Sequence, residues 1–472
     1  MAKLPISELD KIPSFTYDVD KLYQEELKNL NKTIVVLDDD PTGIQTVHGV
    51  NVYTKVDLNT LNNAFNDGNK MFFILTNSRA MSAQESMDYH QKATLNVVLA
   101  AHQTHHDYLV ISRSDSTLRG HYPLETNEIR KEIKFACKND FDGEIIMPFF
   151  LEGGRYTLNN THYVKEGDYL VPAADTEFAK DKTFGYSSSH LGEWIEEKTN
   201  GQYKADDVIY VSLEDLRAGN FDKIESDLLS SKGFNKVVVN AISYDDVKAF
   251  CIPFIRALNK NKFFIIRSAA ALTKILGGID DKPLLTKKDL VASNDQVGGV
   301  VLVGSHTNKT SQQLEQLKQL KDLDFIEFDV SHVFDKEALT NEVNRVTQQV
   351  EADIKANKSV VVYTTRQVLD LKDKSKDEIL KVSTDISDAV TSIIANLTTK
   401  PRFIIAKGGI TSSDVGVKAL NVSKAEVLGQ VRPGIPVWLT GDDSKFSKMP
   451  YIIFPGNVGS VDDLKNIVEE LI

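Results

Sequence analysis

The stretch TIVVLDDDPTG, residues 33–43, decides the fold of this chain. A β-branched, apolar run ends at Leu37 and passes directly into three aspartates and a Pro-Thr-Gly turn. Such a run predicts a strand buried on both faces, which is typical of parallel sheets covered by helices. Similar runs follow at residues 71–75, 108–112, 144–147, 208–211, 236–240 and 263–267. Segments with helical spacing between them, such as 83–103 and 124–137, supply the crossovers that parallel strands need.

A second set of strands follows a stretch without periodicity. Residues 277–299 are rich in Gly, Asp, Lys and Pro and predict a linker. Apolar runs at 300–303, 325–328, 360–363, 403–406 and 451–454 then predict a second α/β domain. We expect domains 1–285 and 286–472, two doubly wound α/β folds with mostly parallel sheets facing a central cleft. Because such sheets bind ligands at the carboxyl ends of their strands, those loops are the places to look for chemistry.

Composition excludes several classes of protein. The 472 residues carry 55 Lys and Arg against 67 Asp and Glu, and this net charge of −12 disfavours nucleic acid as a partner. The amino terminus lacks an apolar signal segment and no apolar run approaches a membrane span, so we expect a cytoplasmic protein without a membrane partner. Cys137 and Cys251 are the only cysteines, too few for a disulfide framework or a thiolate metal site. Strands at exposed sheet edges could pair between subunits, so a homo-oligomer stays an alternative to a monomer.

Charged loops follow the first strands. The carboxylates of residues 38–40 are crowded, which costs stability unless a metal, a proton or a cation offsets it. The alternative is a solvated turn, but the position directly after a strand favours a site. The next loops bring Arg79, Arg113 and Arg119 to the same predicted edge, where guanidinium groups would bind a small anionic ligand. For at least one of them the alternative is an ion pair that only ties loops together.

The segment after the fourth strand, residues 148–164, contains a Gly-Gly-Arg sequence and is expected to be a loop closing over the pocket. Its His162 is read as a structural hydrogen-bonding residue rather than a catalyst. His48 and the histidines at positions 102, 105 and 106 receive less weight still.

Three glycine and hydroxyl loops follow strands in the second domain: GSHT at 304–307, GGIT at 408–411 and GNVG at 456–459. A loop of this kind that opens a helix presents backbone N–H groups and hydroxyls to an anion. A single such loop is usually a tight turn with a helix cap. Three in one domain favour a phosphate-bearing ligand such as a nucleotide, although none matches the Walker pattern.

Taken in order, the loops resemble the four-carbon acid sugar kinase family, long known as a domain of unknown function. Its members phosphorylate threonate, erythronate or 3-oxo-tetronate. The family signatures D-D-F-T-G, T-x-S-R and K-x-D-S-T-x-R-G correspond to residues 39–43, 76–79 and 113–120, and its G-S-x-S/T, G-G-x-T and G-N-x-G loops correspond to the three glycine loops. The resemblance covers nearly the whole chain. Pro41 replaces the usual Phe and Arg113 the usual Lys, which marks a divergent branch.

The resemblance implies an ATP-dependent kinase for a small acid sugar, with ATP and Mg²⁺ as cofactors. The first domain would bind the substrate through Asp39, Arg79, Arg113, Ser114, Asp115 and Ser116. The second would bind the nucleotide through Ser305, Thr307, Gly408, Gly409, Ile410, Thr411, Gly456, Asn457, Val458 and Gly459. As a hypothesis, Arg79 and Arg113 hold the acid's carboxylate, and Asp40 or Asp115 accepts the proton of the attacking hydroxyl.

Two alternatives stay open on the sequence. DDDPT also reads as the D-x-D-x-T motif of haloacid-dehalogenase phosphatases, with Asp38 as nucleophile, but that reading leaves the three glycine loops unexplained. A hinged α/β pair could also clamp a sugar acid without chemistry, as a binding protein.

Overall fold

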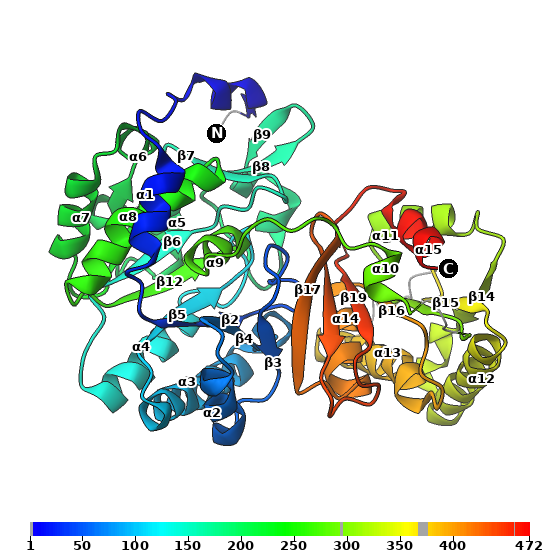
Figure 1. Ribbon diagram of the computed structural model, residues 1–472. Coiled ribbons are helices and arrows are strands. Elements are labelled where there is room, and N and C mark those ends of the chain that lie inside the picture. Colours follow the sequence, from blue (N-terminus) through cyan, green and yellow to red (C-terminus); the bar gives the residue numbers. More distant parts are fainter. Residues whose placement is uncertain (1–2, 293–295, 367–375, 457) are drawn as a thin grey trace. The chain divides into compact units, whose positions relative to one another are not determined.

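The computed structural model describes residues 3–292, 296–366, 376–456 and 458–472 (Figure 1). The chain divides into two compact units, Met1–Asp281 and Lys282–Ile472. Each unit has its own hydrophobic core, and each is described by itself.

The main sheet of the first unit is parallel throughout and has the order β10–β11–β6–β12–β5–β2–β4–β3. The predicted doubly wound α/β class is confirmed here. Leaving β2, the chain builds β3 and β4 on one side and then returns to place β5 on the other, so the winding reverses at β2. The strands are β2 (Thr33–Asp38), β3 (Asn51–Tyr53), β4 (Met71–Leu75), β5 (Tyr108–Arg113), β6 (Gly143–Met147), β10 (Ile209–Val211), β11 (Asn235–Val239) and β12 (Phe264–Ser268).

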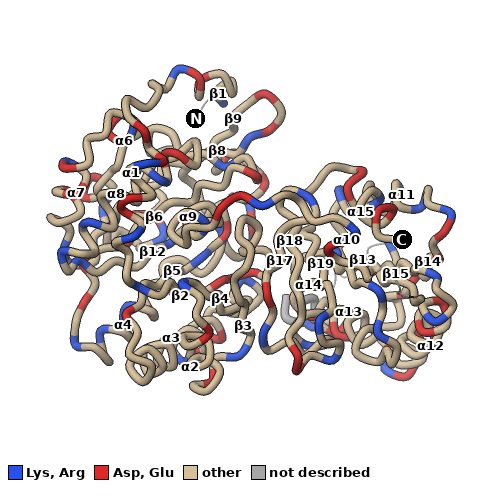
Figure 2. The backbone as a smooth tube through the Cα atoms, viewed as in Figure 1, with Lys and Arg blue, Asp and Glu red and all other residues tan. Residues whose placement is uncertain are grey.

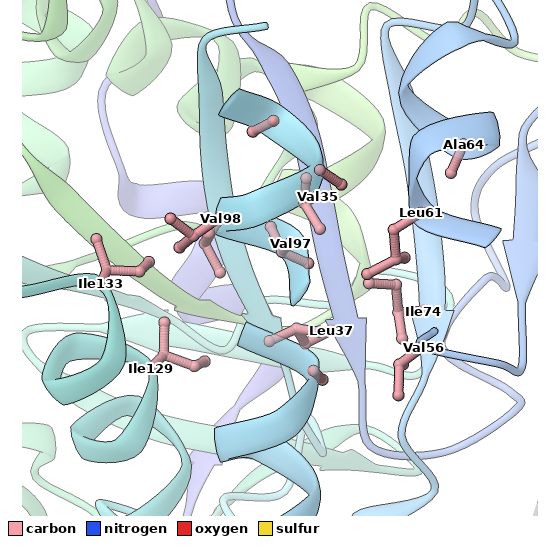
Figure 3. Close-up of a cluster of buried hydrophobic side chains, with 14 of the residues drawn as sticks. Val35, Leu37, Val56, Leu61, Ala64, Ile74, Val97, Val98, Ile129 and Ile133 are labelled. Carbon is pink, nitrogen blue, oxygen red and sulfur yellow. The ribbon is translucent and has the colours of Figure 1, made fainter. Parts of the chain in front are cut away.

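Helices cover both faces of this sheet (Figure 1). One layer packs α2, α3 and α4 together, and the other packs α1, α7, α8 and α9. Figure 3 shows aliphatic side chains of β2 and β4 meeting those of the first layer. The helices are α1 (Val19–Leu27), α2 (Leu58–Asn66), α3 (Ala83–Thr104), α4 (Leu124–Cys137), α5 (Leu191–Lys198), α6 (Leu213–Ala218), α7 (Phe221–Ser230), α8 (Tyr244–Asn259) and α9 (Ala270–Leu276).

A second, antiparallel sheet of the order β1–β9–β8–β7 belongs to the same unit. It consists of β1 (Leu4–Pro5), β7 (Arg155–Leu158), β8 (Thr161–Glu166) and β9 (Tyr169–Pro172). The expectation of a loop over residues 148–164 is therefore wrong for residues 155–164, which form the hairpin β7–β8. Asn159 and Asn160 have φ of 49° and 61°, the left-handed values that a two-residue hairpin turn requires.

The sheet of the second unit has the order β17–β18–β19–β16–β13–β15–β14. The five strands from β19 to β14 are parallel, and the hairpin β17–β18 runs antiparallel beside β19. Here the winding reverses at β13, which lies between β15 and β16. The strands are β13 (Val300–Val303), β14 (Leu323–Phe328), β15 (Ser359–Thr364), β16 (Ile404–Lys407), β17 (Lys424–Arg432), β18 (Ile435–Thr440) and β19 (Pro450–Phe454).

Helices again form two layers, with α11 packed on α15 and α12 on α13. The bounds are α10 (Lys287–Leu290), α11 (Asn308–Leu317), α12 (Lys336–Lys355), α13 (Lys376–Asn396), α14 (Gly409–Asp414) and α15 (Asp463–Leu471). In the ranges that the structure describes, no helix has both the length and the apolar composition to cross a membrane. Basic and acidic residues are interspersed along the chain of both units (Figure 2).

Candidate functional site

The three aspartates lie at the carboxyl end of β2, where the winding of the first sheet reverses. The side chains of Asp38 and Asp39 are 2% exposed, and that of Asp40 is 17% exposed. Gly43 lies directly against Asp38, because a Cβ at that position would approach Asp38 Oδ1 to 2.1 Å. The turn therefore closes over the first carboxylate and leaves the third one more open.

Two arginines neutralise this cluster. Arg79 donates to Asp39 from Nε at 3.1 Å and from Nη2 at 2.8 Å, the two-point geometry that guanidinium and carboxylate groups favour. Its Nη2 is also 3.8 Å from Asp40 Oδ2. Arg113 donates from Nη1 to Asp38 at 3.1 Å and to Asp39 at 3.2 Å. Both arginines predicted to bind a substrate carboxylate are thus already paired within the protein.

Burial and pairing separate the three carboxyl groups. Burial raises the pKa of Asp38 to about 7, with Arg113 opposing it. Burial also raises the pKa of Asp39, although Arg79 opposes it. For Asp40 the burial effect is outweighed by Arg79, by Arg113 and by the hydroxyl and N–H of Thr42, so its pKa is lowered. Asp40 is therefore an ionised, partly exposed carboxylate at neutral pH.

The loop after β5 carries the second predicted group. Asp115 Oδ2 accepts from Arg119 Nε at 2.8 Å and from the Thr117 hydroxyl, and its Oδ1 is 3.5 Å from Arg79 Nη1. Although burial opposes it, pairing with Arg119 and Arg79 holds the pKa of Asp115 well below its usual range. Arg79 therefore has Asp39 and Asp40 on one side and Asp115 on another, which brings the two predicted loops together.

Three further residues complete this edge and were not predicted as site residues. Arg267, in the last strand β12, donates to the Ser114 hydroxyl at 2.7 Å and lies 3.6 Å from Glu125. Ser78 donates to Glu125 at 2.5 Å. Arg267 could have been predicted as a site residue from its position at the end of a strand, which is the feature that identified Arg113.

His162 is a structural residue, as expected. It is fully buried, with Nε2 2.7 Å from the Ser116 carbonyl and Nδ1 3.0 Å from the Thr157 hydroxyl. Since a carbonyl only accepts, Nε2 carries the proton, and burial lowers the pKa of His162 to about 4. A neutral His162 thereby fixes the backbone of Ser116 within the predicted substrate loop.

Hydroxyl groups gather at the carboxyl end of β13 in the second unit. Thr310 donates to Ser305 Oγ at 3.0 Å, and Thr307 donates to Thr310 Oγ1 at 3.0 Å. The Thr307 and Thr310 hydroxyls also lie 3.3 Å from the carbonyl of Gly456. This network joins the first predicted glycine loop to the third, and Thr307 is the N-cap of α11.

Side chains from β16 and α11 hold the carbonyls of the third loop. Lys407 donates to Pro455 and Gly456, Lys309 to Gly459 at 3.2 Å, and Gln313 to Val458 at 3.3 Å and to Ser460 at 2.7 Å. Lys407 is fully buried, and burial lowers its pKa to about 7. Because carbonyl oxygens repel phosphates, tying them to donors favours anion binding by the loop's amide groups.

The second glycine loop packs against the first with no room for larger residues. A Cβ at Gly304 would lie 2.2 Å from Thr411 Oγ1, and one at Gly408 would lie 3.1 Å from Ser305 Cβ. Gly408 has φ of +125°, which other residues rarely adopt. Gly409 begins α14, and Ile410 beside it is 61% exposed, an apolar side chain left open at the loop. Asn457 lies outside the described residues.

Among the residues that the structure describes, no group of three or more His, Cys, Asp or Glu side chains is placed to hold a metal ion. Asp39 and Asp38 are instead paired with Arg79 and Arg113.

Comparison with known proteins identifies both units. A family model described as a sugar-binding N-terminal domain matches residues 34–276, more than half of the chain, and one described as a nucleotide-binding C-terminal domain matches residues 300–464. No curated protein matches the chain.

Two solved structures share the fold. A Salmonella typhimurium LT2 protein provisionally described as a tRNA synthase is 16% identical, with a TM-score of 0.66 over 93% of this chain and 98% of that one. A Haemophilus influenzae protein of the DUF1537 family is 16% identical, with a TM-score of 0.60 over 93% of this chain and 100% of that one. With both domain models matched in order, the chain belongs to the four-carbon acid sugar kinase family, in which a sugar-binding domain precedes a nucleotide-binding domain.

Proposed function

We propose that the protein is an ATP-dependent kinase that phosphorylates a hydroxyl of a small acid sugar, such as threonate, erythronate or 3-oxo-tetronate. One observation carries the proposal: each unit has a polar site where its sheet winding reverses. In the first unit that site is built of carboxylates and guanidinium groups, and in the second of glycines and hydroxyls. These chemistries suit a hydroxy acid and a nucleotide phosphate, respectively.

The residues of the first unit supply a proton acceptor. In the reaction, the substrate hydroxyl oxygen forms a bond to the γ-phosphorus, the bond to the β,γ-bridging oxygen breaks, and ADP leaves. Asp40 accepts the hydroxyl proton, because its carboxylate is ionised and its Oδ2 lies 3.8 Å from Arg79 Nη2, beyond hydrogen-bond distance. Phosphoryl transfer depends mainly on positioning and charge neutralisation, so an acceptor of low basicity is sufficient.

Asp115 has a different role in this proposal. Its two oxygens are committed to Arg119, Thr117 and Arg79, which leaves it a poor proton acceptor. We assign it to holding the guanidinium groups in place around the substrate. Ser114 and Ser116 are both buried and lie on the same loop, where they fix its conformation or donate to the acid's hydroxyls.

The phosphatase alternative receives no support from the geometry. Its nucleophile, Asp38, is 2% exposed, lies beneath Gly43 and accepts from Arg113. A nucleophile must reach the phosphorus of its substrate, which this carboxylate does not do without rearranging the turn.

The direct test is ADP release from Mg-ATP in the presence of threonate, erythronate and 3-oxo-tetronate stereoisomers. Acid-dependent ADP release with one phosphorylated product per ADP would establish the kinase and name its substrate. Phosphate release from phosphomonoesters without ATP would reject it in favour of a phosphatase, and acid binding with no ATP consumption would favour a binding protein.

A further inference from the structure

We propose that Arg155 binds the carboxylate of the acid substrate, a role that the sequence had given to Arg79 and Arg113. The inference rests on the proposed function for the class of ligand, a small hydroxy acid. It adds to that function a residue that sets the preference for an acid over a neutral sugar alcohol.

The arginines of the first unit's site differ in their partners. Arg79 and Arg113 pair with the aspartates of β2, Arg119 with Asp115, and Arg267 lies beside Glu125. Arg155, the first residue of β7, has no carboxylate within ion-pair distance among the described residues. Its Nη1 donates to the carbonyl of Gly153. Its buried Nε has no hydrogen-bond partner among the residues that the structure describes.

Arg155 lies in the same part of the first unit as Arg119 and Asp115. Its guanidinium lies 5.6 Å from the centre of the Phe178 ring, and that of Arg119 lies 5.1 Å from the same centre. Burial lowers the pKa of Arg155, with the charge of Arg119 adding to this effect and that of Asp115 opposing it. Near Asp115, Arg79 and Arg119 are thus paired with carboxylates, and Arg155 has no such pair among the described residues.

A desolvated cation without a counter-ion is costly, and an incoming carboxylate removes that cost. The guanidinium fork matches the two oxygens of a carboxylate and cannot lose its proton at neutral pH. Arg79 lies between Asp40 and Asp115, so it connects the proton acceptor to the side of the site where Arg155 lies. An acid held by its carboxylate at Arg155 would extend its hydroxyl end toward Asp40.

Arg155→Gln tests this assignment by kinetics with an acid and with a neutral polyol of the same length, such as threitol or erythritol. We expect the KM for the acid to rise by about 10- to 100-fold, as for loss of a charge-assisted hydrogen-bonded pair, with the KM for ATP unchanged. The kcat/KM for the polyol should stay at the wild-type value. Arg155→Lys should recover part of the acid preference.

Arg130→Gln is the matched control, because Arg130 also lies over a phenyl ring, Phe234 at 4.5 Å, and is paired with Asp140 away from the site. It should keep the wild-type ratio of acid to polyol. Equal losses for acid and polyol in Arg155→Gln would overturn the proposal, since a structural role would affect both. If the wild-type protein turns over no acid, the proposed function fails by itself. The subsite is then judged by calorimetry, where an unchanged acid Kd in Arg155→Gln would reject it.

Discussion

At the scale of single residues, three identical side chains in a row behave differently because of what surrounds them. Asp38 is enclosed by the turn, Asp39 is shared by two arginines, and Asp40 stays partly exposed. The crowding of like charges is thus relieved by Arg79 and Arg113 and by burial that favours a neutral Asp38. Each of the two outer aspartates supports a separate prediction.

Replacing Asp40 by Asn should remove the proton acceptor while keeping the hydrogen bonds from Thr42. We expect kcat to fall by about 10²- to 10⁴-fold, with the KM values for acid and ATP changing by only a few-fold. Steady-state kinetics measures this, and the melting temperature checks the fold. Asp115→Asn is the comparison: it should raise the KM for the acid more than it lowers kcat. If Asp115→Asn lost the chemical step and Asp40→Asn kept it, the two roles would have to be exchanged.

Replacing Asp38 by Asn should leave acid-dependent ADP release within about tenfold of wild type, whereas a phosphatase with this nucleophile would lose all turnover. The variant also has a distinct pH dependence of stability. Burial raises the pKa of Asp38 to about 7 in the folded protein, from 3.8 in the unfolded chain. The contribution of Asp38 to the free energy of unfolding is therefore full below pH 4 and is lost as the pH rises through 7.

Between pH 5 and pH 7 this loss amounts to about 2 to 3 kcal/mol in the free energy of unfolding. Asp38→Asn should remove this decrease in the free energy of unfolding between pH 5 and pH 7, which urea denaturation at several pH values measures. A slope identical to that of wild type would mean that Asp38 is ionised throughout this range.

At the scale of elements, the second glycine loop is constrained by its backbone as well as by its neighbours. Gly408→Ala adds strain at φ of +125° and places a Cβ 3.1 Å from that of Ser305. Gly429→Ala in β17 is matched in strain, with φ of +135°, but its Cβ would meet only ordinary contacts at 3.6 Å or more. Both should lose about 1 to 3 kcal/mol of stability, and Gly408→Ala alone should raise the KM for ATP by tenfold or more. Equal KM values in the two variants would remove this loop from the nucleotide site.

The elements themselves were largely predictable, because buried parallel strands are continuous apolar runs. The run at 33–37 became β2 and that at 403–406 became β16, each within a residue or two. The hairpin β17–β18 was not predicted, because burial alternates along β17 and leaves no continuous apolar run. The hairpin β7–β8 was not predicted, because residues 148–164, with their Gly-Gly and Asn-Asn pairs, were interpreted as a loop. The ends of the predicted strands located the charged edge of the first sheet. The ion pairs between its arginines and aspartates could not be predicted from the sequence. That Arg155 has no carboxylate partner among the described residues depends on contacts between residues far apart in the chain.

At the scale of the whole molecule, the chain consists of two units with separate cores. The second unit has an apolar cluster drawn from residues 285–471, and the first has clusters that contain none of these residues. If each unit holds one ligand, each ligand should stabilise one unit by mass action. We expect two calorimetric transitions, one raised by an ATP analogue that cannot be hydrolysed and the other raised by the acid.

At a ligand concentration of about 100 times Kd, the stabilisation is about 2.7 kcal/mol, which corresponds to roughly 5 to 10 °C for a domain of about 200 residues. Gly408→Ala should reduce the shift caused by the nucleotide by about half or more and keep the one caused by the acid, and Arg155→Gln should do the reverse. A single transition raised by either ligand would contradict independent units. An acid that raised the transition affected by Gly408→Ala would place its site in the second unit, because a ligand stabilises the part of the molecule that holds it.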